Sequence, residues 1–150
     1  MTLQVTSSAF SNGGTIPTVY TCDGQDVAPP LEWSGEPKQT RSFAVICEDP
    51  DAPSGTFTHW VLYDVPASAH GVGDHASIGK AGVNDFGSRR FGGPCPPKRD
   101  SAHHYHFHVY ALDLDSIGPV GLSKRDAMKA MRGHVLAEAE LIGTYKRATI

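Results

Sequence analysis

Cysteine is scarce in this chain, and its placement is informative. The 150 residues include three cysteines, Cys22, Cys47 and Cys95, which lie far apart and form no C-x-x-C pair. An odd set with this spacing argues against a disulfide framework and against a zinc knuckle. Cys47 lies in an apolar run and is expected to be a small buried hydrophobic residue. Cys95 lies among prolines and is expected to fill a tight turn, since a catalytic thiol would need a base beside it.

Charge and long apolar runs are also sparse. The formal net charge is −3 at pH 7, and no basic stripe indicates nucleic acid as a partner. No run of about 18 apolar residues occurs, which argues against a transmembrane segment. The first residues, "MTLQVTSSAFSNGG", lack the basic start and apolar core of a signal peptide. We therefore expect a cytoplasmic protein that folds as a single domain over residues 1–150.

Glycine and proline, in contrast, recur throughout and divide the chain into short segments. This punctuation is typical of an all-β sandwich or barrel. The segments "RSFAVICE" (41–48) and "HWVLYDVP" (59–66) are apolar at both alternating sets of positions, as strands covered on both faces are. Residues 67–102 show little periodicity, and so long an irregular segment within a compact domain is usually functional.

The last third of the chain carries one clear helix signal and one ambiguous segment. Ser123, followed by Asp126 three residues later, predicts the start of a helix that ends near Gly133. In residues 134–148, alanine and glutamate favour a helix, whereas alternating apolar positions favour a strand. Local patterns alone leave that choice open.

The segment "AHHYHFHVYAL" (102–112) contains four of the eight histidines. On a strand, successive side chains point to opposite faces. The face that turns toward the core would carry His103, Tyr105, Phe107 and Val109. The other face would carry His104, His106, His108 and Tyr110. Alternate histidines can bind zinc, but no third ligand stands at a characteristic spacing, so we expect this second face to be solvated or covered by a helix, without a metal.

Three further segments contain residues suited to a binding site. In "CEDPDAPSG" (47–55), two prolines stiffen the loop that carries Asp49 and Asp51. His59 stands at the start of the next apolar strand. In "FGGPCPPK" (91–98), glycines allow backbone N–H groups to approach a ligand, while prolines fix the loop. Each signal is weak by itself.

Taken together and in this order, "DPDAP", "HWVLYDVP", "GGPCPP" and "HHY-F-VYALD" resemble the phosphatidylethanolamine-binding protein family. The closest branch is the bacterial and archaeal one often labelled Raf kinase inhibitor-like. The resemblance extends from "SSAF" through "APPLEW" to "MRGHVLAEAELIGTYKR", which is essentially the whole chain. It implies a mainly β fold, an antiparallel β-sandwich with one or a few short peripheral helices, and it implies a strand for the ambiguous last segment.

The resemblance also implies a small anion pocket that needs neither a cofactor nor a metal. The positions that match the family's motifs are Asp49, Asp51, Ala52, Pro53, His59, Gly93, Pro94, Cys95, Pro96, Pro97, His103 and Tyr105. The family usually has arginine between the last two residues, where this chain has His104, so that a permanent charge is replaced by a titratable one.

The chemistry of such a pocket follows from its side chains. Two imidazoles, a phenol and the backbone amides of the Gly/Pro loop can donate to phosphoryl or carboxylate oxygens. A bound anion favours imidazolium, so binding should strengthen as the pH falls toward about 6.5. The aspartates have the wrong sign for an anion and are expected to orient a histidine instead.

These observations favour a non-catalytic protein that binds a small anionic or phosphorylated ligand, such as a phospholipid headgroup. The resemblance also implies a protein kinase or a protease as a partner that is inhibited. The alternative is a hydrolase with His59 or His103 as the general base. Against it, the chain has no G-x-S-x-G or H-E-x-x-H motif and no evident nucleophile–base pair.

Overall fold

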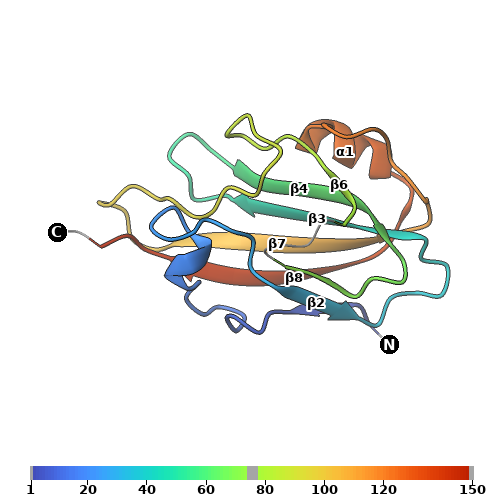
Figure 1. Ribbon diagram of the computed structural model, residues 1–150, viewed down its shortest axis with the longest axis horizontal. Helices are drawn as coiled ribbons and strands as arrows, with labels where there is room; N and C mark the ends of the chain where they lie inside the picture. The colour runs from blue at the N-terminus through green and yellow to red at the C-terminus, as the bar shows by residue number, and fades with distance from the viewer. Residues whose placement is uncertain (1, 74–77, 149–150) are drawn as a thin grey trace.

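A computed structural model describes residues 2–73 and 78–148. It contains two antiparallel sheets (Figure 1). The smaller has the strand order β1-β2-β5 and consists of β1 (Gln4–Thr6), β2 (Leu31–Ser34) and β5 (Gly71–Val72). The larger has the order β6-β4-β3-β7-β8 and consists of β3 (Ser42–Asp49), β4 (Phe57–Pro66), β6 (Lys80–Ala81), β7 (His103–Leu112) and β8 (Val135–Tyr145). The expected mainly β sandwich is confirmed, and so is the final strand.

The main core lies between the two sheets. Leu31 and Trp33 of β2 pack against Phe43 and Val45 of β3, and the rings of Trp33 and Phe43 lie 5.3 Å apart. Strand β7 contributes alternate residues to this core, as its period-two pattern predicts. Its buried set begins with His103, which places a polar group where the core meets solvent.

The outer face of the larger sheet carries a second apolar cluster. Helix α1 (Lys124–Met131) covers it with Ala127 and Met131, which pack against Ile46 and Tyr110 of the sheet. The helix begins as its sequence predicts, because the Ser123 hydroxyl accepts a hydrogen bond from the Asp126 amide at 3.1 Å. A short 3-10 helix, η1 (Thr18–Tyr20), is the other helical element of the described residues.

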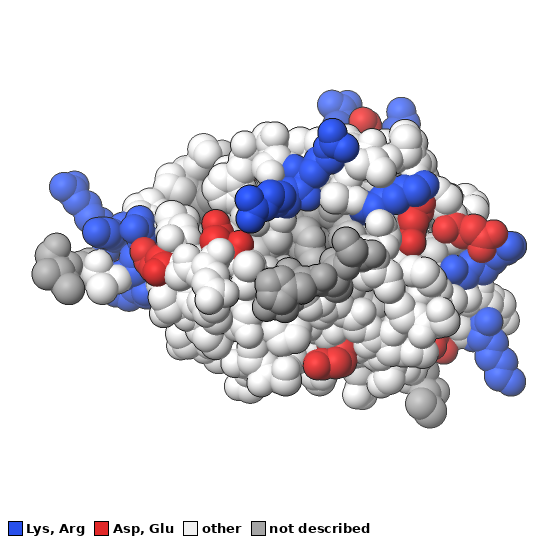
Figure 2. Space-filling view, viewed as in Figure 1, with Lys and Arg blue, Asp and Glu red and all other residues white. Residues whose placement is uncertain are grey.

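The irregular segment between β4 and β7 remains mostly loop. It contains only the two-residue strands β5 and β6 within its described part. The first part of this segment leaves β4 at one end of the sandwich, whereas its last part, before β7, lies at the other end, with the loop that joins β3 to β4 (Figure 1). On the face shown in Figure 2, most of the surface is uncharged, and lysines and arginines are interspersed with acidic residues.

Candidate functional site

A cavity of about 320 Å³ opens where the loops after β3 and before β7 meet the end of the larger sheet. Nine of the twelve positions suggested by the family resemblance line it: Asp49, Ala52, Pro53, His59, Cys95, Pro96, Pro97, His103 and Tyr105. The remaining lining residues are Ser54, Phe57 and Phe86. Asp51, Gly93 and Pro94 lie outside the wall of this cavity.

A β-bulge directs His59 into the cavity. Cys47 of β3 pairs with Trp60 of β4, and Glu48 pairs with Thr58, so His59 is an extra residue between two regular pairs. Without this bulge, alternation would place His59 on the same face as Val61, beneath helix α1. Bulges re-aim side chains in this way next to binding sites.

The irregular segment before β7 donates two hydrogen bonds to the backbone carbonyl group of His59. It accepts hydrogen bonds from the amide of Gly92, at 3.1 Å, and from Nδ2 of Asn84, at 3.0 Å. Asn84 is buried, and its Oδ1 accepts from the amides of Phe86 and Ser88. The sequence analysis did not identify Asn84, which connects the bulge to the loop that carries Phe86.

His103 is held between two carboxylates. Its Nδ1 lies 2.6 Å from Oδ2 of Asp49, and its Nε2 lies 2.8 Å from Oδ2 of Asp100. Burial alone would lower the pKa of His103, but the hydrogen bonds to Asp49 and Asp100 outweigh it and raise this pKa above its ordinary value. Asp49 is buried and orients the imidazole, as second-layer carboxylates do in other sites.

The pKa of His59 is shifted in the opposite direction from that of His103. Burial lowers the pKa of its imidazole below the ordinary value, and a hydrogen bond to the carbonyl of Gly92 offsets this only in part. That carbonyl lies 2.7 Å from Nδ1 of His59. Because a carbonyl can only accept, Nδ1 carries the proton, and Nε2 of the neutral ring is an acceptor. The pKa values of the two cavity histidines are therefore shifted in opposite directions.

The Tyr105 hydroxyl is a buried polar group at the cavity. The side chain is fully buried, and its Oη has no hydrogen-bond partner among the described residues. Burial and the nearby Asp49 carboxylate raise the pKa of Tyr105 well above its ordinary value, so the hydroxyl keeps its proton. A buried donor without an acceptor costs about 1–3 kcal/mol, which an oxygen-bearing ligand in the cavity would recover.

Aromatic rings form one wall of the cavity. The ring of Phe86 lies 4.8 Å from that of Phe57 and 5.4 Å from that of His59, in both cases edge to face. Phe86 is half-exposed despite its size, so it presents an apolar surface at the cavity mouth. This wall was not apparent from the sequence, because Phe86 stands in the segment without periodicity.

Asp51 and His104 pair with each other outside the cavity. Oδ2 of Asp51 accepts from the backbone amide of His104 at 2.9 Å and lies 2.8 Å from its Nδ1. These contacts lower the pKa of Asp51, the largest cause being the hydrogen bond to the His104 side chain. His104, which replaces the family's usual arginine, is therefore turned away from the cavity.

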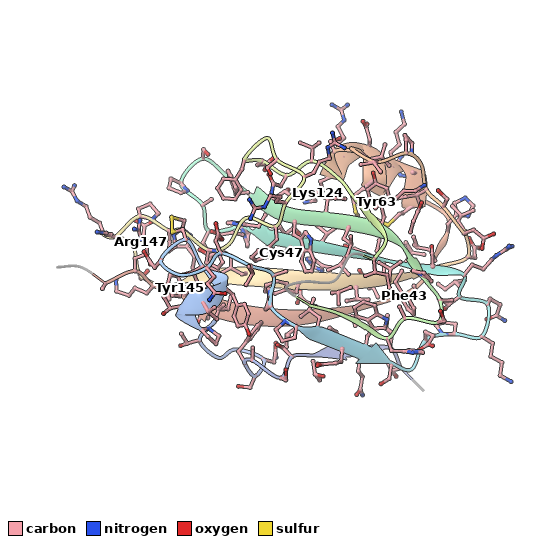
Figure 3. All side chains as sticks on the ribbon, in the orientation of Figure 1. Phe43, Cys47, Tyr63, Lys124, Tyr145 and Arg147 are labelled. Atoms are coloured by element: carbon pink, nitrogen blue, oxygen red, sulfur yellow. A yellow bond between two sulfur atoms is a disulfide. The ribbon has the colours of Figure 1, made fainter. Side chains whose placement is uncertain are left out.

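Cys95 forms a disulfide with Cys22, 73 residues earlier in the chain. The sequence argued against a disulfide framework and did not predict this bond, whereas the expectation of a small buried residue is confirmed for Cys47, which is free. Spacing alone cannot reveal a pair that forms only when two distant loops meet. Figure 3 shows the disulfide as a yellow bond at the end of the molecule that also carries Tyr145 and Arg147.

The Gly/Pro loop is bonded to the rest of the protein and has few free donors. The amide of Gly93 donates to Oδ1 of Asp26 at 2.6 Å, and the carbonyl of Pro94 accepts from the amide of Cys22. A Cβ atom at position 93 would collide with the carbonyl of Tyr20. Gly93 thus allows close packing of two loops, and its amide is not available to a ligand in the way the sequence suggested.

Comparisons with known proteins identify the family to which the chain belongs. The family described as phosphatidylethanolamine-binding protein matches residues 6–146. The chain is 47% identical to a UPF0098 protein of Aquifex aeolicus, over 97% of this chain and 89% of that one. It is 43% identical to a UPF0098 protein of Methanothermobacter thermautotrophicus, over 97% and 99%.

Two solved structures share the fold over almost their whole length. A phosphatidylethanolamine-binding protein homologue of Chlamydia trachomatis, CT736, has a TM-score of 0.92 and 38% identity, with 97% of this chain and 98% of that one covered. Escherichia coli YbcL, described as a new member of the mammalian family, has a TM-score of 0.90 and 33% identity, with 98% and 99% covered. The chain belongs to the phosphatidylethanolamine-binding protein family. Among its described residues, no helix has the length and apolar character required to cross a membrane.

Proposed function

We propose that the cavity binds the phosphoryl group of a small phosphorylated molecule of about the size of a phospholipid headgroup. The observation that carries this proposal is the buried, unpartnered hydroxyl of Tyr105. A phosphoryl oxygen is the acceptor that this hydroxyl lacks. The ring wall of Phe57 and Phe86 offers contact to the organic part of the ligand.

The charges around the cavity restrict the net charge that a bound ligand can carry. Two carboxylates, Asp49 and Asp100, flank His103, so that one excess negative charge remains beside the site even when His103 is protonated. A phosphate dianion would be repelled there, because charges at such short range interact strongly in a partly buried site. A phosphodiester, a protonated phosphate or a zwitterion with an ammonium group avoids this repulsion. We therefore infer a preference for singly charged or zwitterionic phosphorylated ligands.

Removal of the Tyr105 hydroxyl tests the proposal directly. Tyr105→Phe should weaken the binding of dimethyl phosphate and of phosphoethanolamine about 10- to 100-fold, since a hydrogen bond to a charged group contributes about 1.5–3 kcal/mol. Isothermal titration calorimetry measures the change. Tyr110→Phe is the matched control, because Tyr110 lies on the same strand but faces helix α1. Equal affinity in the Tyr105 variant and in the wild type would refute the proposal, as would unchanged binding in the His59→Ala/His103→Ala double variant.

The affinity should rise as the pH is lowered from about 8 to about 6. His103 has a raised pKa, so it loses its charge as the pH rises through a value above the ordinary one of about 6.5, whereas His59 has a lowered pKa and gains charge only below that ordinary value. Both changes add positive charge to the cavity on acidification. Dimethyl phosphate is the suitable probe, since it remains a monoanion over this range. Titrations at several pH values that gave a flat or rising affinity with pH would contradict this electrostatic account.

A binding function is favoured over hydrolysis by the state of His103 and Cys95, whereas His59 keeps the acceptor nitrogen that a general base needs. Both ring nitrogens of His103 are already bonded to carboxylates, and the sulfur of Cys95 is bonded to Cys22. Histidine-dependent turnover of a phosphoester would overturn this assignment. Inhibition of a kinase or a protease, which the resemblance implies, would act through the surface of the protein and needs no chemistry in the cavity.

The location of the protein is linked to its disulfide. The sequence favoured the cytoplasm, but disulfides persist mainly in oxidising compartments, with the intracellular proteins of hyperthermophiles as an exception. The Cys22–Cys95 bond therefore argues against a location in an ordinary reducing cytoplasm. We infer that the protein works where this bond is maintained.

A further inference from the structure

Three side chains converge on the outer face of the larger sheet, opposite the cavity. His106 and His108 lie at alternate positions of β7, and Glu140 lies on β8, directly across from His108. Each offers one potential ligand atom, and these atoms lie within 4.8 Å of one another. The sequence placed the two histidines on one face but gave no third ligand. The pairing of β7 with β8 supplies it, because Glu140 is far away in sequence and adjacent in the sheet.

The distances match those of a metal site. Oε2 of Glu140 lies 3.0 Å from Nδ1 of His106 and 3.5 Å from Nδ1 of His108. Around a tetrahedral zinc ion with ligand distances of about 2.0–2.2 Å, neighbouring donor atoms lie about 3.4 Å apart. The two imidazole rings are stacked, with centroids 6.1 Å apart and an angle of 17° between their planes. Two ring nitrogens therefore face the same carboxylate oxygen.

A second set of contacts supports His108. Its Nε2 is buried and lies 3.2 Å from Oε1 of Glu48, without the alignment of a hydrogen bond. Glu48 belongs to β3, and its other oxygen is paired with Lys124 at the start of α1. Figure 3 labels this lysine. Histidines that bind a metal through one nitrogen commonly donate from the other to a carboxylate, which fixes their orientation. Glu48 is placed for that role.

The neighbouring histidine does not join the group. His104 precedes His106 on the same face, but its ring is paired with Asp51 beyond the end of β3. The candidate ligands are partly buried, with 24% and 17% of the His106 and His108 side chains exposed, while 41% of the Glu140 side chain is exposed. A fourth coordination position would consequently face solvent from the side of Glu140.

We propose that His106, His108 and Glu140 bind a divalent transition-metal ion, with zinc as the representative case. Two imidazoles and one carboxylate form a ligand set that zinc accepts, with a fourth position left for water or an added ligand. Such a site would bridge β7 and β8. It lies on the opposite face from the proposed phosphoryl cavity and is independent of it.

Zinc titration of the untagged 150-residue chain tests this inference. The protein is first treated with a chelator and then titrated with zinc chloride in a calorimeter, and bound metal is counted by mass spectrometry after gel filtration. We expect one zinc ion per chain. Glu48→Gln should weaken binding about tenfold through loss of support for His108. His106→Ala, His108→Ala and Glu140→Gln should each weaken it more, since each removes a ligand.

A matched control separates this site from general surface binding. His134→Ala removes an exposed histidine whose Nδ1 also pairs with a carboxylate, 2.8 Å away on Asp113, but which has no second histidine beside it. This variant should bind zinc as the wild type does, and so should the His59→Ala/His103→Ala double variant. Absence of stoichiometric zinc in the wild type would overturn the inference. Equal binding in the Glu140→Gln and wild-type proteins, or equal loss in the His134→Ala variant, would overturn it as well.

Discussion

Reduction of the Cys22–Cys95 disulfide is expected to lower the free energy of unfolding by about 4 kcal/mol. The bond joins residues 73 apart, and the chain-entropy treatment of a loop of this length gives a stabilisation of about that size. It ties the Gly/Pro loop to the N-terminal loop, where one backbone hydrogen bond also joins Cys22 to Pro94. The same loop lines the cavity, so reduction should also weaken binding of dimethyl phosphate.

Urea unfolding with and without a phosphine reductant measures this effect. The reductant should shift the midpoint of the wild type and leave that of the Cys22→Ser/Cys95→Ser double variant unchanged. The double variant reports any effect of the reductant on Cys47, which is free and buried. If the reductant fails to move the wild-type midpoint, the disulfide does not stabilise the fold as described.

Asp49→Asn should destabilise the protein by about 3 kcal/mol at pH 6. Asp49 and His103 are both almost fully buried, and removal of one member of a buried ion pair leaves the other charge uncompensated, at a cost of about 3–5 kcal/mol. The second carboxylate on His103, from Asp100, is more exposed and limits the loss to the lower end of this range. The variant preserves side-chain shape, and its Oδ1 can still accept from the Asp51 amide, so the effect arises at the contact with His103.

The pH dependence identifies the partner of Asp49. His103 has a raised pKa, so its stabilising contribution is fully present below its unfolded-state value of about 6.5 and is lost as the pH rises through the folded-state value. The cost of Asp49→Asn should therefore shrink between pH 6 and pH 9. Asp113→Asn, which breaks an exposed pair with His134, should cost less than about 1 kcal/mol. Equal costs at both pH values would contradict the assignment of charge to His103.

The alternation of β7 was predictable because burial on a strand has a period of two residues. That rule placed His103 and Tyr105 on the core side and His106 and His108 on the outer side, and the observed burial agrees. The final strand was not predictable in the same way. Its alanines and glutamates favour a helix locally, and its pairing with β7 along ten residue pairs prevails over that preference.

Other parts of the site depend on tertiary contacts that produce no recognisable pattern in the local sequence. The bulge at His59 is an offset of one residue between two strands, and neither strand shows it alone. The disulfide, the buried Asn84 and the ring of Phe86 belong to irregular loops whose positions are set by tertiary contacts. The same holds for Glu140, which meets the histidines of β7 only through strand pairing.

A crystal structure of the protein soaked with arsenate, measured at the arsenic absorption edge, tests the central claim most directly. Arsenate has the shape of phosphate, and the soak is made at about pH 5, where arsenate is a monoanion and carries the charge that the cavity prefers. Its anomalous signal locates it without ambiguity. The account predicts a peak in the cavity, with an arsenate oxygen at hydrogen-bonding distance from the Tyr105 hydroxyl and with Asp49, His59 and His103 around it. A cavity without a peak, while arsenate occupies other positions on the same molecule, would contradict the account.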